Sequence, residues 1–222
     1  HFDHSFELEE TLFAKGKVAA LETVRGMIHE PGTVAYVRQQ EPAGLGHAVW
    51  CARHLIHDEP VAVLLADDLI LGSSCLAEMV ASYQGGNMVA VMDVPKSETG
   101  SYGIITPGAD HGQLIEVSGL VEKPEPANAP SNIGVVGRYI IESGVFAQLG
   151  TQDRGAGNEV QLTDALARQI GKVPFHGFRF SGERFDCGSK IGFLQANIAF
   201  AMSRDDLAEP IASWIKNRMA LS

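Results

Sequence analysis

Continuous apolar runs and amphipathic stretches alternate along the first half of the chain. Residues 61–65 (VAVLL) and 88–92 (MVAVM) carry apolar side chains without alternation, which is typical of central strands covered on both faces. Residues 45–56 repeat small and apolar side chains at spacings of three and four, which predicts a helix, and residues 76–83 form a second predicted helix. This order of strands and helices predicts an α/β fold with a largely parallel sheet.

The pattern predicts further elements on both sides of this region. Helices are expected from Ser5 onward and over 18–28, followed by a strand over 33–37. The second half of the chain contains shorter predicted strands (102–106, 113–121, 132–141 and 175–180) and predicted helices (142–149, 161–170, 191–202 and 207–219). No repeat or low-complexity tract interrupts the sequence, so we expect residues 1–222 to form one domain, with residues 204–222 as a C-terminal helix.

Charge and cysteine content narrow the possible partners and compartment. The chain has 17 basic and 27 acidic residues, for a formal net charge of -10, whereas nucleic-acid binding needs a basic face. No apolar run approaches the ~20 residues that span a bilayer. The three cysteines are far apart and form no C-x-x-C pair, which favours a reducing cytoplasm. We therefore expect a cytoplasmic protein with neither a nucleic acid nor a membrane as its partner.

Residues 44–49 read G-x-G-x-x-V after a predicted strand, which approaches the dinucleotide-binding fingerprint. Asp67 follows about 20 residues later, where that fold places its ribose-binding acid. However, the fingerprint begins directly at the strand end, and here residues 39–43 intervene. An NAD site is therefore the weaker interpretation of this loop.

The same loop contains groups that suit a planar base. The side-chain amide of Gln39 offers a carbonyl and an NH2 group together, which can match the donor and acceptor edge of a pyrimidine. Gly44 has no Cβ, so its backbone can approach a base closely. The alternative is a solvated loop in which the glycine only helps to start a helix, and the loop chemistry alone leaves both interpretations open.

Eight segments of the chain occur in a characteristic order. They are the Gln39–Gly44 loop, LLADD (64–68), SYG (101–103), VEKP (121–124), PSN (130–132), VGRY (136–139), GNEVQLTDA (157–165) and FDCGSK (185–190). In order and spacing the chain resembles the bacterial UTP–glucose-1-phosphate uridylyltransferases, within the larger sugar-nucleotide pyrophosphorylase family. The resemblance implies a single nucleotidyltransferase domain with a Rossmann-like nucleotide-diphospho-sugar transferase fold, in which helices flank a mixed, mostly parallel central sheet.

Two aspartates are candidate metal ligands. Asp67 follows an apolar strand, at the edge where open α/β sheets bind ligands, and a carboxylate there can hold Mg2+ together with phosphate oxygens. The resemblance implies that Asp186 is the second acid beside the metal. The alternative for either residue is a helix cap or a turn acid. Because side chains alternate along a strand, Asp68 is expected to point away from Asp67.

The resemblance also implies a sugar pocket. Glu122 would accept hydrogen bonds from sugar hydroxyls and Lys123 would meet the sugar phosphate, roles that suit a carboxylate and an ammonium. Gly103 would offer its backbone to the sugar, and Val135 and Tyr139 would line the pocket. A surface salt bridge is the alternative for Glu122 and Lys123, and a place in the core is the alternative for Val135 and Tyr139.

The implied reaction joins UTP and glucose 1-phosphate to give UDP-glucose and pyrophosphate, without a covalent protein intermediate. Its catalytic groups would be Lys123 and the Mg2+-holding Asp67 and Asp186, with Gln39 and Gly44 on the uracil. A dTTP-dependent transferase and a non-catalytic sugar-nucleotide-binding protein remain alternatives. The family's Gly-rich loop has no match in residues 1–32, so we expect an N-terminal part to be missing. The resemblance further suggests a homodimer or homotetramer, with residues 207–219 as a possible contact.

Overall fold

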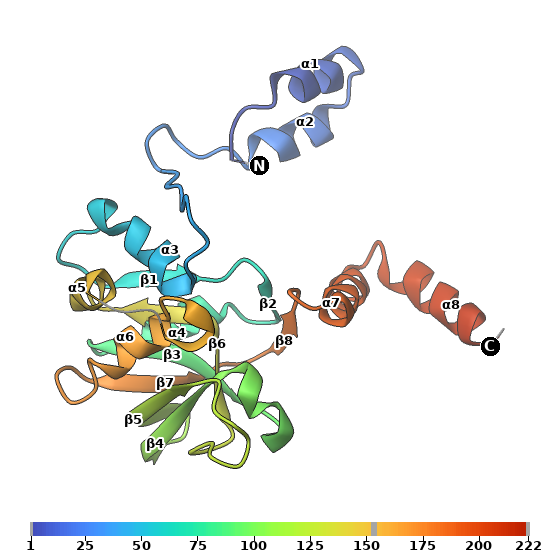
Figure 1. Ribbon diagram of the computed structural model, residues 1–222. Helices are drawn as coiled ribbons and strands as arrows, with labels where there is room; N and C mark the ends of the chain where they lie inside the picture. Colours follow the sequence, from blue (N-terminus) through green and yellow to red (C-terminus); the bar gives the residue numbers. More distant parts are fainter. Residues whose placement is uncertain (1, 152–154, 221–222) are drawn as a thin grey trace. The chain divides into compact units, whose positions relative to one another are not determined.

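The computed structural model describes residues 2–151 and 155–220, which divide into two compact units, His1–Arg38 and Gln39–Ser222. The first unit is a pair of helices, α1 (Phe6–Ala14) and α2 (Val18–Arg25), joined by a short turn (Figure 1). Buried Glu9 ties them together by accepting a 2.9 Å hydrogen bond from Arg25 Nε. The strand predicted over 33–37 is wrong, because this stretch is largely exposed and forms no strand.

The second unit is built on a six-stranded sheet with the order β1-β6-β3-β7-β5-β4. In that order the strands are Val61–Leu64, Ile133–Ile141, Asn87–Asp93, Phe175–Arg179, Leu114–Glu122 and Gly103–His111. The α/β class and the mixed sheet are confirmed, but the expectation of a mostly parallel sheet is wrong for the described strands. Only β3 and β7 pair in parallel there, while β1, β3 and β4 each lie antiparallel to β6. The apolar run over 88–92 correctly indicated a strand buried on both faces, but the same expectation for 61–65 is wrong. Strand β1 lies at the edge of the described sheet, and its Ala62 and Leu64 are exposed. Neither run encodes strand direction.

Helices cover both faces of this sheet (Figure 1). On β3, Val89 and Val91 belong to one core cluster, and Met88 and Ala90 belong to another, so the strand alternates between two buried faces. The first cluster includes residues of α3 (Leu45–Cys51), α5 (Gly144–Gly150) and α6 (Leu162–Ala167); the second includes residues of α4 (Cys75–Ser82). The continuous apolar pattern of β3 is thus explained by two-sided burial.

A small antiparallel ribbon of β2 (Asp68–Leu71) and β8 (Glu183–Asp186) was not predicted. Its register sets Asp68 opposite Asp186 and Ile70 opposite Arg184. Opposite residues of an antiparallel pair project to the same face, and residues two apart on one strand share a face. The ribbon therefore presents Asp68, Arg184 and Asp186 on one side, which is the side that carries the candidate site.

The remaining elements lie around this framework. They are the 3-10 helices η1 (Arg53–Leu55), η2 (Lys96–Ser101) and η3 (Ala156–Asn158), and the C-terminal helices α7 (Lys190–Met202) and α8 (Ala208–Met219). Helix α7 contacts β2 and β8, and α8 contacts α7. Of the predicted segment 204–222, residues 221 and 222 lie outside the described residues. Among the described helices, none has the length and apolar character needed to cross a membrane.

Candidate functional site

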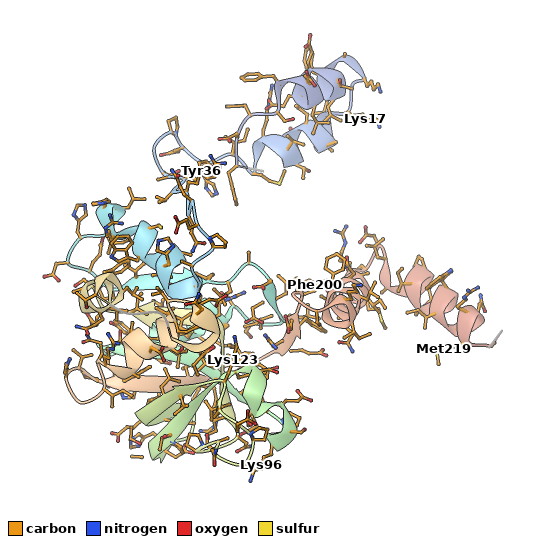
Figure 2. All side chains as sticks on the ribbon, in the orientation of Figure 1. Lys17, Tyr36, Lys96, Lys123, Phe200 and Met219 are labelled. Carbon is orange, nitrogen blue, oxygen red and sulfur yellow. The ribbon has the colours of Figure 1, made fainter. Side chains whose placement is uncertain are left out.

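A cavity of about 350 Å³ opens beside the β2–β8 ribbon and the ends of β5 and β6. It collects most of the site residues predicted from the sequence: Asp67, Gly103, Glu122, Lys123, Val135, Tyr139 and Asp186. Lys123 lies at this cavity, whereas Lys96 on η2 is an exposed lysine away from its lining; both are labelled in Figure 2. Gln39 and Gly44 are not among the lining residues and form a separate arrangement before α3.

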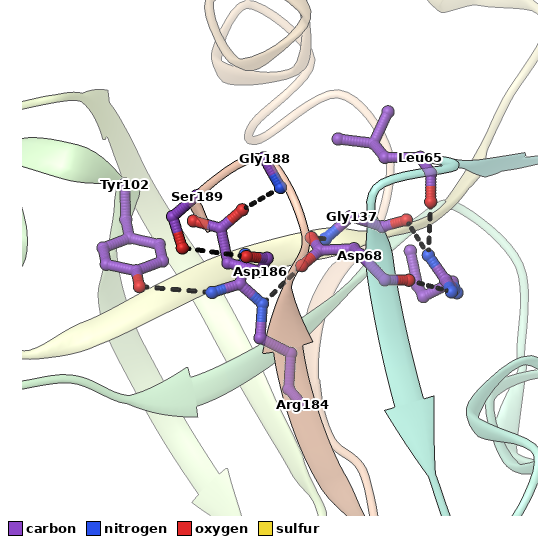
Figure 3. Close-up of polar contacts among 9 residues, drawn as sticks. Leu65, Asp68, Tyr102, Gly137, Arg184, Asp186, Gly188 and Ser189 are labelled. Carbon is purple, nitrogen blue, oxygen red and sulfur yellow. Dashed lines mark hydrogen bonds and ion pairs between the residues drawn. The ribbon is translucent and has the colours of Figure 1, made fainter. Parts of the chain in front are cut away.

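Asp67 and Asp186 are brought side by side by the backbone. The Cys187 amide donates a 2.8 Å hydrogen bond to the Asp67 carbonyl, and the Gly188 amide donates one of 2.9 Å to Asp186 Oδ1 (Figure 3). A Cβ placed on Gly188 would lie 3.0 Å from Asp186 Oδ1 and 3.3 Å from Asp67 Oδ2. Both carboxylates thus adjoin the same glycine, and a side chain at that position would crowd them.

This pair of carboxylates suits a hard divalent cation. Both aspartates are exposed, and within the described ranges neither takes part in an ion pair with a basic side chain. Mg2+ is typically held by one or two carboxylates, with waters and substrate phosphate oxygens completing its octahedron. Two adjacent carboxylates without a direct ion-pair partner among the described residues, both lining the cavity, fit that donor set.

Asp68 also lines the cavity, which corrects the expectation that it points away. Asp67 lies in a turn and β2 begins only at Asp68, so strand alternation does not apply between them. The buried Asp68 carboxylate accepts a 2.6 Å hydrogen bond from the Gly137 amide and forms an ion pair with Arg184 Nε (Figure 3). Arg184 Nη1 also donates a 3.3 Å hydrogen bond to the Tyr102 hydroxyl.

Arg184 is therefore a fixed cation in the cavity wall. Burial lowers its pKa, but the hydrogen bond to Asp68 and the negative charges of Asp68 and Asp186 outweigh burial and raise the pKa above its ordinary value. The guanidinium stays protonated while Asp68 holds it in place. Its charge also offsets part of the negative charge that two aspartates bring to this edge.

Glu122 also lines the cavity and is oriented by Thr163. Thr163 Oγ1 donates a 2.8 Å hydrogen bond to Glu122 Oε2, while Lys123 Nζ lies 3.5 Å from Glu122 Oε1. The Glu122 side chain is 11% exposed and that of Lys123 is 50% exposed, so the carboxylate is nearly enclosed and the ammonium is accessible. Gly103 is necessary here, because a Cβ on it would lie 2.9 Å from Thr163 Cγ2.

Lys123 has an unusual backbone conformation, with φ at 46°. A positive φ is uncommon for a residue other than glycine, and it persists where the surroundings fix it. The Lys123 amide donates a 2.9 Å hydrogen bond to the Tyr102 carbonyl, which fixes the chain as it leaves β5. This turn places Lys123 at the cavity directly after Glu122.

Strand β6 presents Val135, Gly137 and Tyr139 to the cavity. Val135 and Tyr139 are also buried members of the core cluster, so the lining and core interpretations both hold. Burial, helped by the charges of Glu122 and Asp68, raises the pKa of Tyr139, which keeps its hydroxyl neutral.

The G-x-G loop is shaped by close packing. A Cβ on Gly44 would lie 2.8 Å from the Val160 carbonyl oxygen and one on Gly46 would lie 2.7 Å from it. Gly46 donates a 2.8 Å backbone hydrogen bond to the same carbonyl. These glycines let the start of α3 lie against the segment before α6, so the G-x-G pattern has a structural explanation without a dinucleotide.

Sequence reasoning missed several cavity residues that organise the site, namely Asp68, Tyr102, Thr163 and Arg184. Arg184 carried a usable signal, because it precedes Asp186 by two positions and so shares its face of a strand. Thr163 lies within the GNEVQLTDA segment (157–165), to which the sequence assigned no site residue. Arg184 binds Asp68 and Thr163 binds Glu122. These partners are distant in sequence, so no local pattern could predict the two contacts.

Comparison with known proteins places this geometry in context. Residues 3–203 match the family model described as nucleotidyl transferase. A UTP–glucose-1-phosphate uridylyltransferase of Komagataeibacter xylinus is 50% identical over 194 residues, which are 86% of this chain and 68% of that protein. A UTP–glucose-1-phosphate uridylyltransferase of Bacillus subtilis (strain 168) is 41% identical over 220 residues, 98% of this chain and 74% of that protein.

Solved structures of high similarity point the same way. A UDP-glucose pyrophosphorylase complexed with UDP-glucose superposes with a TM-score of 0.79 at 37% identity, covering 86% of this chain and 74% of its own. A UTP-bound enzyme of the same type from Acinetobacter baumannii gives a TM-score of 0.86 at 34% identity, covering 96% of this chain and 76% of its own.

Proposed function

Because the chain belongs to the nucleotidyl transferase family, we propose that it transfers the uridylyl group of UTP to glucose 1-phosphate. The single observation that carries this proposal is the cavity that the Asp67–Asp186 pair and the Glu122–Lys123 pair line together. The first pair offers carboxylates for a cation with phosphates, and the second offers a carboxylate and an ammonium for a phosphorylated sugar. The named relatives act on, or are bound to, these same compounds.

In this reaction a phosphate oxygen of glucose 1-phosphate attacks the α-phosphorus of UTP in line. The bond from the α-phosphorus to the bridging oxygen of the β-phosphate breaks, so UDP-glucose forms and pyrophosphate leaves. Such phosphoryl chemistry depends mainly on alignment and on neutralising negative charge. Asp67 and Asp186 would hold Mg2+, and the bound cation supplies positive charge against the phosphate oxygens.

The remaining residues hold the sugar phosphate. We assign Lys123 to its phosphate, since the ammonium is accessible and Glu122 steadies it from 3.5 Å. Glu122 accepts hydrogen bonds from sugar hydroxyls, with Thr163 fixing one carboxylate oxygen. Gly103, Val135 and Tyr139 form the surrounding wall. Gln39 and Gly44, on the loop before α3, are assigned to the uracil.

The test is direct conversion of UTP and glucose 1-phosphate in the presence of Mg2+, with UDP-glucose and pyrophosphate both quantified. Lys123→Ala is expected to lower turnover by orders of magnitude, since removing one donor that stabilises charge developing in a transition state costs about 10²–10³-fold in kcat. Lys96→Ala, at an exposed lysine outside the cavity, is the matched control and should match wild type. Unchanged melting curves would confirm that both variants fold.

Different outcomes separate the alternatives. Faster conversion with dTTP than with UTP would favour a thymidylyl transferase. Binding of UDP-glucose without release of pyrophosphate would favour a non-catalytic sugar-nucleotide-binding protein. A Lys123→Ala variant with near-normal turnover would remove Lys123 from the catalytic groups while leaving the reaction itself in place.

We also propose a cytoplasmic homodimer or homotetramer. Cys51, Cys75 and Cys187 are free thiols, which suits a reducing compartment. Helix α8 leaves Trp214 63% exposed and Met219 74% exposed, and exposed large apolar side chains favour burial against another subunit. Light scattering coupled to gel filtration would measure the mass, and a monomer at micromolar concentration would contradict the assembly.

A further inference from the structure

The side-chain amide of Gln39 has a defined orientation. Its Nε2 lies 3.0 Å from the Gly44 carbonyl oxygen and 3.0 Å from Nδ1 of His47. A carbonyl oxygen only accepts hydrogen bonds, so the amide nitrogen must face Gly44. The NH2 group has two hydrogens, and the second one points to the His47 ring.

This contact also fixes the tautomer of His47. To accept from Gln39, Nδ1 must carry a lone pair, which is the tautomer that has its ring proton on Nε2. That nitrogen lies 3.9 Å from Cys51 Sγ, which is a weak acceptor. The ring stacks on Trp50 with centroids 6.0 Å apart, and Arg53 covers Trp50 at 3.5 Å. The imidazole is thus held from several sides within α3 and η1.

Gly44 and His47 use both hydrogens of the Gln39 amide. Its Oε1 oxygen, for which the described residues provide no donor, is therefore the side-chain atom that can meet a ligand. This differs from the sequence-based expectation that Gln39 offers a donor and an acceptor together. A lone acceptor matches the N3–H donor of uracil. Cytosine carries an acceptor at N3, so its lone pair would face Oε1 without a hydrogen between them.

We propose that His47 is a positioning residue that selects uracil over cytosine by fixing the amide of Gln39. This inference rests on the proposed function, in which Gln39 meets the base. His47 does not contact the nucleotide itself. Without His47, only the hydrogen bond to Gly44 opposes a turn of the amide. A turned amide gives up that bond and presents its nitrogen to the base, where cytosine accepts a hydrogen bond.

Two variants of His47 test the proposal. His47→Phe keeps a flat ring but removes the Nδ1 acceptor, whereas His47→Asn keeps an acceptor oxygen near the position of Nδ1. For His47→Phe we expect the KM for UTP to rise about fivefold, the effect of one ordinary hydrogen bond, with kcat little changed. The ratio of kcat/KM for UTP to that for CTP should fall by about the same factor or more. His47→Asn should restore both values.

A role in loop packing alone would lower the melting temperature of His47→Phe and leave the UTP-to-CTP ratio unchanged, and that result would overturn the proposal. Calorimetric titration of UMP and CMP separates this inference from the proposed reaction. Suppose that wild type makes no UDP-glucose, and that it prefers UMP to CMP while His47→Phe does not. This result would refute the proposed reaction and support the role of His47. Equal binding of UMP and CMP by wild type would overturn the role of His47, whatever the reaction.

Discussion

Replacing Arg184 by methionine removes a charge from the wall of the cavity while keeping an unbranched side chain. In the native protein Arg184 pairs with Asp68, and the two side chains are only 12% and 8% exposed. Among the described residues, the Asp68 carboxylate has one other hydrogen-bond partner, the Gly137 amide at 2.6 Å. Arg184→Met therefore leaves a buried carboxylate with a single backbone hydrogen bond.

The loss of folding stability in Arg184→Met follows from the buried, unpaired charge of Asp68. Truncating one member of a buried ion pair typically destabilises a protein by about 3–5 kcal/mol, because the other charge stays buried. Because Asp68 keeps its hydrogen bond from Gly137, we expect Arg184→Met to lower the free energy of unfolding by about 3 kcal/mol, the lower end of this range. Asp68→Asn should cost a similar amount by stranding the guanidinium. The double variant removes both charges and keeps an acceptor for Gly137, so it should be more stable than the sum of the single effects predicts, by about 2 kcal/mol or more.

Urea denaturation followed by circular dichroism measures these differences through the shift in midpoint. Arg179→Met is the matched control, since Arg179 forms its ion pair with Asp110 at the surface, where the two side chains are 35% and 52% exposed. Its midpoint should move far less than that of Arg184→Met. The reasoning is refuted if Arg184→Met costs less than about 1 kcal/mol, or if the double variant shows simple additivity.

Two further predictions concern Thr163 and the cysteines. Thr163→Val removes the 2.8 Å donor to Glu122, so the KM for glucose 1-phosphate should rise about fivefold. Thr163→Ser keeps the hydroxyl donor and should keep the wild-type KM. Equal kinetics for the two variants would contradict the role of Thr163 in orienting Glu122. Burial raises the pKa of Cys75 to about 11, so iodoacetamide at pH 8 should label half-buried Cys51 and Cys187 first. Mass spectrometry of the peptides would show this order, and early labelling of Cys75 would contradict it.

The main sheet could be largely predicted from the sequence because its strands carry strong apolar runs. Residues 88–92 lie within β3, which is buried on both faces, and residues 61–65 contain β1. Strand direction could not be predicted, because an apolar run reads the same in parallel and antiparallel sheets. The Thr33–Val37 segment has strand-like composition but forms no strand, since composition does not supply a neighbouring strand.

The β2–β8 ribbon shows a second limit. Each strand has four residues, which is too short for a reliable period of two. Asp68 and Arg184 are 116 positions apart, and only this ribbon brings them together. By contrast, Glu122 and Lys123 are adjacent in sequence, so a family motif could identify them. Most residues recognised through motifs line the cavity, although Gln39 and Gly44 do not. Residues that act through contacts distant in sequence were missed.

The most direct test of the account is whether Asp67 and Asp186 hold one divalent cation together with the nucleotide. Mn2+ can replace Mg2+ and be counted by electron paramagnetic resonance in the presence of UTP. We expect Asp67→Asn and Asp186→Asn each to weaken Mn2+ binding by about tenfold or more, while Asp110→Asn, in an exposed surface pair, binds as wild type does. Wild-type Mn2+ affinity in both cavity variants would contradict the shared cation site.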